Sequence, residues 1–134
     1  MAIELTEDLL SGNDEIDEQH RQIFERSNTF LAAANQDRGE EIVAGVVDFL
    51  EAFCIYHFHA EETAMLTSGY PAYEGHVALH NELMRGVYKL RQKADAEGPS
   101  KALVTITSRL LVEILVNHVR KVDRELMVFL RAKA

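Results

Sequence analysis

Residues 57–80 read HFHAEETAMLTSGYPAYEGHVALH, and this stretch decides how the rest of the chain is interpreted. It contains two pairs of metal-binding residue types, each pair four positions apart: His57 with Glu61, and His76 with His80. On an α-helix this spacing places two side chains on one face, one turn apart, so each pair is able to bind a common ion. The turn signals TSGYP, residues 67–71, separate the pairs and predict two helices joined by a short connection.

Outward from this stretch, apolar residues recur at helical spacing along nearly the whole chain, and turn signals fall in only a few places. The pattern predicts an all-α fold in which Asp14 is the N-cap of the first helix. The expected parts are an N-terminal arm over residues 1–13 and helices at about 15–35, 40–66, 72–96 and 100–130. Four long amphipathic helices with short loops imply an up-down-up-down antiparallel four-helix bundle, one domain over residues 1–134.

The charge balance narrows the classes of partner. There are 22 acidic and 14 basic residues, a formal net charge of −8, so we expect neither nucleic acid nor an anionic membrane as a partner. The start of the chain does not resemble a leader, and no apolar run approaches the length that spans a bilayer. The single cysteine, Cys54, excludes an intramolecular disulfide and fits a reducing compartment. We therefore expect a cytoplasmic protein that is a monomer or weak oligomer.

Five of the six histidines fall on predicted inward helix faces, together with two carboxylates. The set is His20, His57, His76, His80 and His118 with Glu61 and Asp123. Taken alone, each histidine is more often a hydrogen-bonded core residue than a metal ligand. As a set they would leave several buried charges unpaired, at a cost of several kcal/mol each, and a metal-free structural bundle would be unstable. Metal binding resolves this conflict.

The types of ligand indicate which metals fit. Imidazole and carboxylate groups favour iron, manganese, zinc, copper or nickel, and seven ligands are too many for one such ion. If both carboxylates bridge two octahedral ions, the protein ligands and a shared oxo or hydroxo bridge leave one position open for a small ligand. Iron is the redox-active choice for such a site, and zinc remains an adventitious alternative.

The spacing between His118 and Asp123 does not suit an ideal α-helix. Five residues rotate the two side chains by roughly 140° around the helix axis. A π-turn would bring them together, so the sequence predicts a π-bulge within residues 118–123.

These residues resemble the hemerythrin family over residues 14–130. The matching motifs are I-D-x-Q-H, H-F-x-x-E-E, S-G-Y-P followed by H-x-x-x-H, and N-H-x-x-x-x-D. In this chain they are Ile16, Asp17, Gln19 and His20; His57, Phe58, Glu61 and Glu62; Ser68, Gly69, Tyr70, Pro71, His76 and His80; and Asn117, His118 and Asp123. One departure is the arm, which lacks the tryptophan usual in the family and has Asn13 after Gly12, so we expect a looser seal at that end.

The resemblance implies two non-haem iron ions bridged by Glu61 and Asp123. It assigns one iron to His76, His80 and His118, and the other, which binds O2 end-on and reversibly, to His20 and His57. It also implies an apolar wall that keeps water out, for which we predict Leu115, Val119 and Val122. Small anions or NO are possible competing ligands.

Three functions follow as alternatives. The first is reversible O2 binding for carriage, storage, scavenging or delivery, which the histidine-rich ligand set favours over enzymatic oxidation. The second is a diiron peroxidase or a nitric oxide reductase type of enzyme, and the third is an O2 or redox sensor. We expect no enzymatic role.

Residues next to the predicted ligands have simpler interpretations. We expect His59 on the surface, Cys54 as an inert core residue, Glu62 solvated, and Asp17 as an acid that complements the dipole at the start of the first helix.

Overall fold

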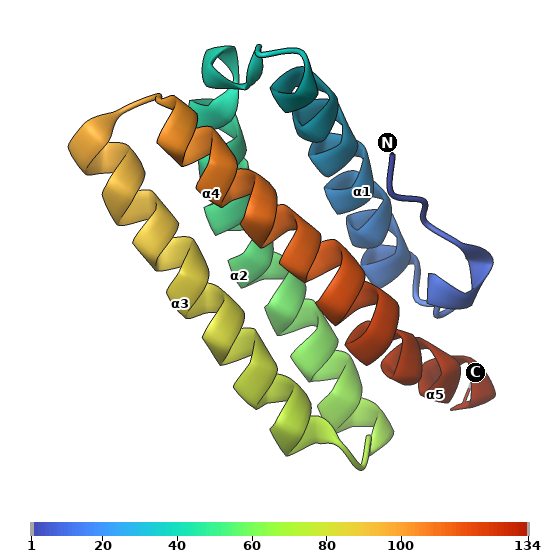
Figure 1. Ribbon diagram of the computed structural model, residues 1–134. Coiled ribbons are helices and arrows are strands. Elements are labelled where there is room, and N and C mark those ends of the chain that lie inside the picture. The colour runs from blue at the N-terminus through green and yellow to red at the C-terminus, as the bar shows by residue number, and fades with distance from the viewer. Residues whose placement is uncertain (1, 134) are drawn as a thin grey trace.

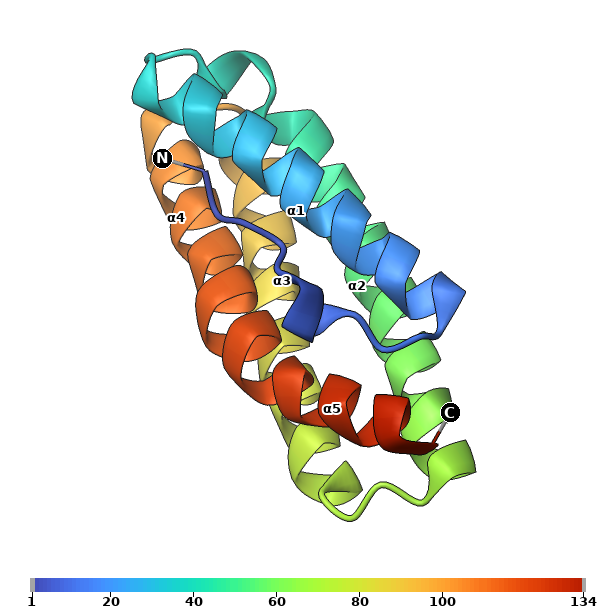
Figure 2. The same ribbon diagram turned by 90° about the vertical axis from the view of Figure 1, so that its right-hand side faces the viewer.

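The computed structural model describes residues 2–133 and has the expected all-α architecture (Figure 1). Three helices are α1 Asp14–Asn35, α2 Val43–Ser68 and α3 Tyr73–Glu97. The last helix is continuous through α4 Lys101–Val112, a π-helical segment Glu113–Asp123 and α5 Arg124–Lys133. Consecutive helices run antiparallel, as Figures 1 and 2 both show, so the predicted four-helix bundle is confirmed.

The first helix is capped by a different residue from the one predicted. Asn13 has an extended backbone, and its side chain accepts a hydrogen bond from the backbone N–H of Ile16 at 3.2 Å. The prediction that Asp14 is the N-cap is therefore wrong, because Asp14 is already the first helical residue. Asn is as good an N-cap as Asp, since either side-chain oxygen satisfies a free N–H of the first turn.

The second helix begins later than predicted. Gly39–Glu41 forms a 3-10 turn, and Ile42 has φ −123° and ψ −3°, which separates that turn from α2. A side chain at Gly39 would meet Val104 Cγ1 at 2.8 Å, so this corner requires glycine for the close approach of the last helix. The other end of α2 follows expectation: Gly69 is left-handed with φ 71°, and Tyr70 N–H reaches back to the Met65 carbonyl at 2.9 Å.

Two apolar clusters make up the core, and the polar candidate residues fall between them. Along α1, His20 lies between Ile16 of the smaller cluster and Ile23 of the larger one. Along α2, Glu61 likewise lies between Phe58 and Met65. The bundle therefore surrounds a buried polar layer with apolar side chains above and below, which excludes water from it.

The N-terminal arm lies against α1 and the last helix (Figure 2). Its Leu9 is buried, and the Leu10 carbonyl accepts a hydrogen bond from Arg131 at 2.7 Å. Nearer the N-terminus, the backbone of Ile3 forms two hydrogen bonds of 2.8 Å with the Asn28 side chain. These contacts hold the arm against α1 and the last helix without a tryptophan, and the expected looser seal stays a prediction.

Helix Val43–Ser68 and the continuous helix Lys101–Lys133 are long and apolar enough to span a membrane by length and composition alone. The expectation that no segment reaches that length is therefore wrong. Core helices of globular proteins have the same composition, and here the buried faces of both helices line the bundle core.

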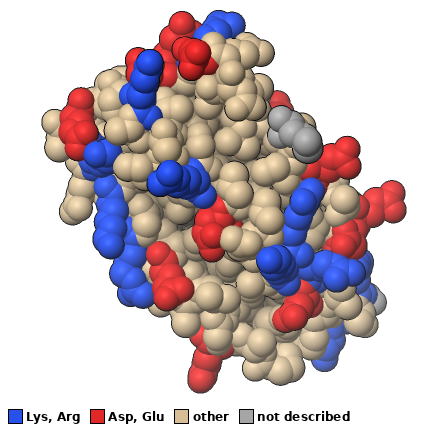
Figure 3. All heavy atoms as spheres, in the orientation of Figure 1, with Lys and Arg blue, Asp and Glu red and all other residues tan. Residues whose placement is uncertain are grey.

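On the face of the molecule that Figure 3 shows, basic and acidic side chains are interspersed.

Candidate metal centre

All seven predicted ligand residues are buried and lie together. They form two groups that share both carboxylates: Glu61, His76, His80, His118 and Asp123 in one, and His20, His57, Glu61 and Asp123 in the other. Within each group the potential ligand atoms lie within 4.8 Å of one another. Side chains from α1, α2, α3 and the last helix thus meet in one layer of the bundle.

Each oxygen of the Glu61 carboxylate faces a different histidine group. Oε2 lies 3.3 Å from His20 Nε2 and 3.1 Å from His57 Nε2. Oε1 lies 3.4 Å from His76 Nε2 and 3.1 Å from His80 Nε2. A carboxylate in this position is placed to bridge two ions.

Asp123 divides its oxygens in the same way. Oδ1 lies 2.9 Å from His76 Nε2 and 3.0 Å from His118 Nε2, whereas Oδ2 lies 3.5 Å from His20 Nε2. The two carboxylates therefore stand between a three-histidine side and a two-histidine side.

The buried atoms of this layer are poorly satisfied by the protein alone. Those without a hydrogen bond of good geometry include the Nε2 atoms of His20, His57, His76 and His118, Glu61 Oε2, and both Asp123 carboxylate oxygens. Buried polar atoms without partners are costly, and groups of this kind indicate an ion that the protein holds. The donor set of neutral imidazole and carboxylate suits first-row transition metals such as iron.

The electrostatics of the cluster favour protonated His20 and His76 when metal is absent. Burial lowers the pKa of His20, but the nearby carboxylates of Asp123 and Glu61 outweigh burial and raise the pKa to about 10. The same balance raises the pKa of His76 to about 9. The pKa values of Glu61 and Asp123 lie well below their ordinary range, because the surrounding histidines outweigh the effect of burial.

Three of the histidines are anchored through their outer nitrogen, which leaves Nε2 directed at the centre. His20 Nδ1 lies 3.3 Å from the Leu9 carbonyl of the arm, and His57 Nδ1 lies 2.7 Å from Gln19 Oε1. His80 Nδ1 lies 2.9 Å from Glu62 Oε2. Partners of this kind fix the tautomer and ring orientation of a metal-binding histidine.

Two acidic residues have roles that differ from expectation. Glu62 was expected to be solvated, but it is only partly exposed, and its carboxylate accepts the hydrogen bond from His80. Asp17 does lie in the first turn of α1, but its buried carboxylate also accepts hydrogen bonds from the Ser11 and Gly12 backbone at 2.7 and 3.1 Å. Asp17 therefore ties the arm to α1.

The predicted π-turn is confirmed and is longer than expected. The π-helical segment spans Glu113–Asp123, and it brings the side chains of His118 and Asp123 to within 3.0 Å. The extra residue per turn compensates for a spacing that an α-helix would direct to different faces.

The remaining expectations concern nearby side chains. His59 is exposed as predicted, and Cys54 is buried, where burial raises the pKa of its thiol to about 12. Two aromatic rings of the apolar core also pack against histidines of the cluster. Phe58 stacks on His80 with centroids 4.0 Å apart, and Phe53 stacks on His57 at 5.2 Å.

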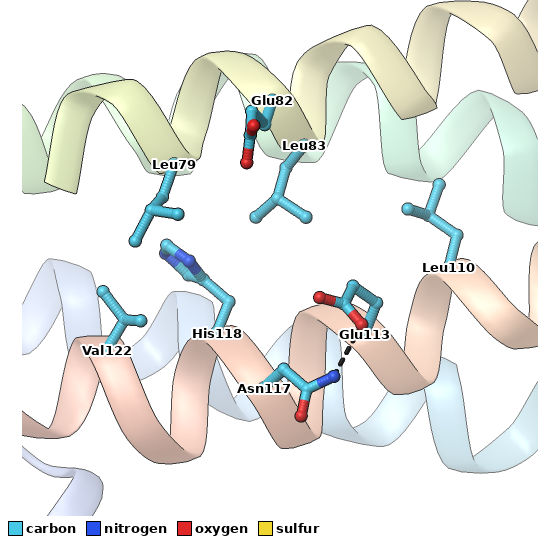
Figure 4. A pocket seen from close by; sticks show the side chains of 8 residues that line it. All are labelled: Leu79, Glu82, Leu83, Leu110, Glu113, Asn117, His118 and Val122. Carbon is cyan, nitrogen blue, oxygen red and sulfur yellow. Dashed lines mark hydrogen bonds between the residues drawn. The ribbon is translucent and has the colours of Figure 1, made fainter. Parts of the chain in front are cut away.

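The three residues predicted as an apolar wall occupy two environments. Leu115 and Val119 are buried in the larger apolar cluster. Val122 is half-buried and lines a surface pocket of about 260 Å³ beside His118. Figure 4 shows Leu79, Glu82 and Leu83 reaching into this pocket from α3. The role of the three residues as a wall remains a prediction.

Comparisons with known proteins agree with this geometry. The family model described as the hemerythrin HHE cation binding domain matches residues 11–130. Bacteriohemerythrin of Stenotrophomonas maltophilia (strain R551-3) is 36% identical over 120 residues, which cover 88% of this chain and 74% of the relative. Bacteriohemerythrin of Methylococcus capsulatus (strain Bath) is 35% identical over 109 residues, 81% of this chain and 80% of the relative. The chain belongs to the hemerythrin family.

Proposed function

We propose that this protein binds O2 reversibly at two non-haem iron ions, for carriage, storage, scavenging or delivery of the gas. The observation that carries the proposal is the shared position of Glu61 and Asp123, each with its oxygens divided between two groups of histidines. His76, His80 and His118 would hold one iron, and His20 and His57 the other. An oxo or hydroxo group would complete the bridge.

The two irons would supply the electrons that O2 takes up on binding and returns on release. The protein residues decide where O2 binds, because the two-histidine side offers one nitrogen ligand fewer than the three-histidine side. Gln19 and the Leu9 carbonyl hold the two imidazoles of that side in place. Buried Leu115 and Val119 would limit the access of water to the bound gas.

Reversible binding is favoured over an enzymatic role by the nature of the ligands. Five neutral imidazoles and only two carboxylates stabilise high-valent iron less well than the carboxylate-rich sets of diiron oxidation enzymes. NO and small anions would compete for the same open position. We place the protein in the cytoplasm as a monomer or weak oligomer, and its net charge of −8 disfavours nucleic acid and anionic membranes as partners.

The visible absorption spectrum of the iron-loaded, reduced protein tests this function. We expect a band that appears when O2 is admitted and disappears when the gas is removed. The variant His57→Ala should lose the band, whereas the exposed His59→Ala should retain it. Direct passage to a stable oxidised spectrum would favour an enzyme instead, and the absence of any iron-dependent spectrum would overturn the assignment.

A further inference from the structure

A surface pocket of about 260 Å³ lies between α3 and the last helix, on the three-histidine side of the metal centre. Leu79 and Glu82 line it from α3, and Glu113, Asn117 and His118 line it from the last helix. Figure 4 shows the two groups of side chains on opposite walls of the pocket. Neither the packing of the bundle nor the set of ligands explains why two carboxylates stand at this position.

A predicted iron ligand forms part of the pocket wall. His118 is only 3% exposed, and its Nε2 lies 3.0 Å from Asp123 Oδ1 without a hydrogen bond of good geometry. The same imidazole therefore borders both the pocket and a buried carboxylate of the metal centre. An ion held against this wall would be one side chain away from the centre.

The buried position of the centre limits how a metal ion reaches it. All seven predicted ligand residues are buried, and apolar clusters lie on both sides of their layer. A divalent ion without polar partners is strongly disfavoured among apolar side chains. A path for the ion must therefore present oxygen or nitrogen atoms, as this pocket does.

The two carboxylates of the pocket are available to a cation. Glu82 and Glu113 are exposed, and neither forms an ion pair in the part of the chain that the structure describes. Asn117 Nδ2 donates a hydrogen bond of 2.6 Å to Glu113 Oε2, which orients that carboxylate but leaves its charge in place. Among the described residues, neither glutamate belongs to a group of potential ligand atoms within 4.8 Å of one another. The pair would therefore attract an ion without retaining it.

Basic side chains lie near this pocket but do not line it. Lys89 and Arg109 line a neighbouring pocket that Glu113 also borders, and Lys121 donates a hydrogen bond of 3.4 Å to Asn117 Oδ1. These charges weaken the local negative potential. The lining itself holds two carboxylates and no Lys or Arg, so its own charge favours a cation and disfavours an anion.

We propose that Fe²⁺ reaches the three-histidine side of the metal centre through this pocket, attracted by Glu82 and Glu113 and then bound by His118 at the pocket wall. A neutral gas would gain nothing from two carboxylates, so their presence favours an ion over O2 as the species that the pocket admits. This inference deepens the proposed function and rests on it for the identity of the metal. The two glutamates raise the rate of iron uptake, whereas the buried ligands set the affinity.

The rate of Fe²⁺ uptake by the metal-free chain, measured without O2, tests the role of the two carboxylates. The double variant Glu82→Gln/Glu113→Gln should take up iron about threefold more slowly or less, with the final iron content unchanged. Glu25→Gln/Glu40→Gln, at two exposed positions elsewhere, removes the same charge and should load as the parent does. Added salt should slow the parent more than the pocket variant. Equal uptake rates in the two double variants would overturn the proposal.

A change of bulk in the pocket tests the path itself. Leu79 lines this pocket and Ile106 lines the neighbouring one, and each is 38% exposed. Leu79→Trp should slow the release of iron from the reduced, iron-loaded protein to a chelator, whereas Ile106→Trp should not. Leu79→Ala should speed release. Because damage to the adjacent ligand His80 would speed release, slower release in Leu79→Trp identifies obstruction. Release as fast as in the parent would contradict the path.

The outcome is separable from that of the O2 experiment, since iron uptake and release are both measured without O2. A protein that loads iron through the pocket but shows no reversible O2 spectrum would retain the path and lose the proposed function. A reversible O2 spectrum together with unaltered iron rates in all the pocket variants would retain the function and overturn the path. If Leu79→Trp slowed only the association of O2, the pocket would admit the gas, and the proposal would be wrong.

Discussion

The two sides of the metal centre share their carboxylates but differ in how their histidines are anchored. On the three-histidine side, His80 is held by the carboxylate of Glu62. On the two-histidine side, both anchors are neutral: the side-chain amide of Gln19 and the backbone carbonyl of Leu9. A carboxylate partner makes an imidazole a stronger base and a stronger ligand than a neutral partner does. The surroundings of the ligands, as well as their number, would therefore make two bound irons unequal.

The largest effect should come from removing a residue that both sides share. Glu61→Ala removes a carboxylate that lies between the two sides and leaves four of their histidines without this central partner. Disruption of a buried charge network of this kind costs about 3–5 kcal/mol, so we expect a less stable protein that retains neither iron. Iron content per chain and denaturant unfolding measure this. A variant that keeps one iron would show that the two sides are independent.

The next effect is confined to the two-histidine side. Leu9 is 1% exposed, and its carbonyl contacts His20, so Leu9→Ala should cost about 2–5 kcal/mol of stability and loosen the arm. Entry of water beside His20 should make the irreversible loss of the O2-dependent absorption several-fold faster. The half-buried neighbour Leu10→Ala serves as the control. Equal decay rates in the two variants would contradict a sealing role for Leu9.

Variants of the residues that anchor the histidines should change the iron affinity of one side without changing that of the other. Glu62→Gln weakens the support of His80 and Gln19→Leu removes that of His57, and each should lower the affinity for one iron by about 10–100-fold. Iron release to a chelator should occur in two phases, with each variant accelerating a different phase. Acceleration of the same phase by both variants would rule out the proposed division of ligands.

The smallest effect is one of pH, and it involves one histidine from each side. Because the folded pKa values of His20 and His76 are raised to about 10 and about 9, their protonation stabilises the metal-free protein fully below pH 6.5. That stabilisation is lost as the pH rises through about 9 and 10. Metal must displace both protons, so metal affinity should rise with pH above neutrality.

Titration calorimetry in buffers of different ionisation enthalpy counts these protons. At pH 7 we expect loading of the metal-free protein to release one proton from His20 and one from His76, in addition to those that water gives up when it forms the bridging hydroxo or oxo group. His59→Ala should leave the count unchanged, because this histidine is exposed. Metal uptake without proton release would contradict the electrostatic account of the empty cluster.

The sequence predicted those features of the molecule that depend on spacing within one helix. Pairs four residues apart placed His57 with Glu61, and the five-residue gap from His118 to Asp123 predicted the π-helical segment. Helical periodicity also predicted the bundle. Each of these follows from the geometry of a single helix, whatever its neighbours.

Features that depend on how helices pack against one another were missed. Glu62 is rotated by about 100° from Glu61, so it seemed to face solvent, but α3 packs on that side and brings His80 to it. Gln19 was part of a recognised motif, yet its hydrogen bond to His57 spans 38 residues of sequence. The predicted start of α2 was wrong. The corner before it depends on the close approach of Val104 to Gly39, which is also a contact between segments distant in the sequence.

The most direct test of the account is an anomalous-difference map at the iron absorption edge from crystals of the iron-loaded protein. We expect two peaks in the buried layer. One should lie beside Nε2 of His76, His80 and His118 and the other beside Nε2 of His20 and His57, with Glu61 and Asp123 contacting both. A single peak, or two peaks with the histidines divided in another way, would contradict the account.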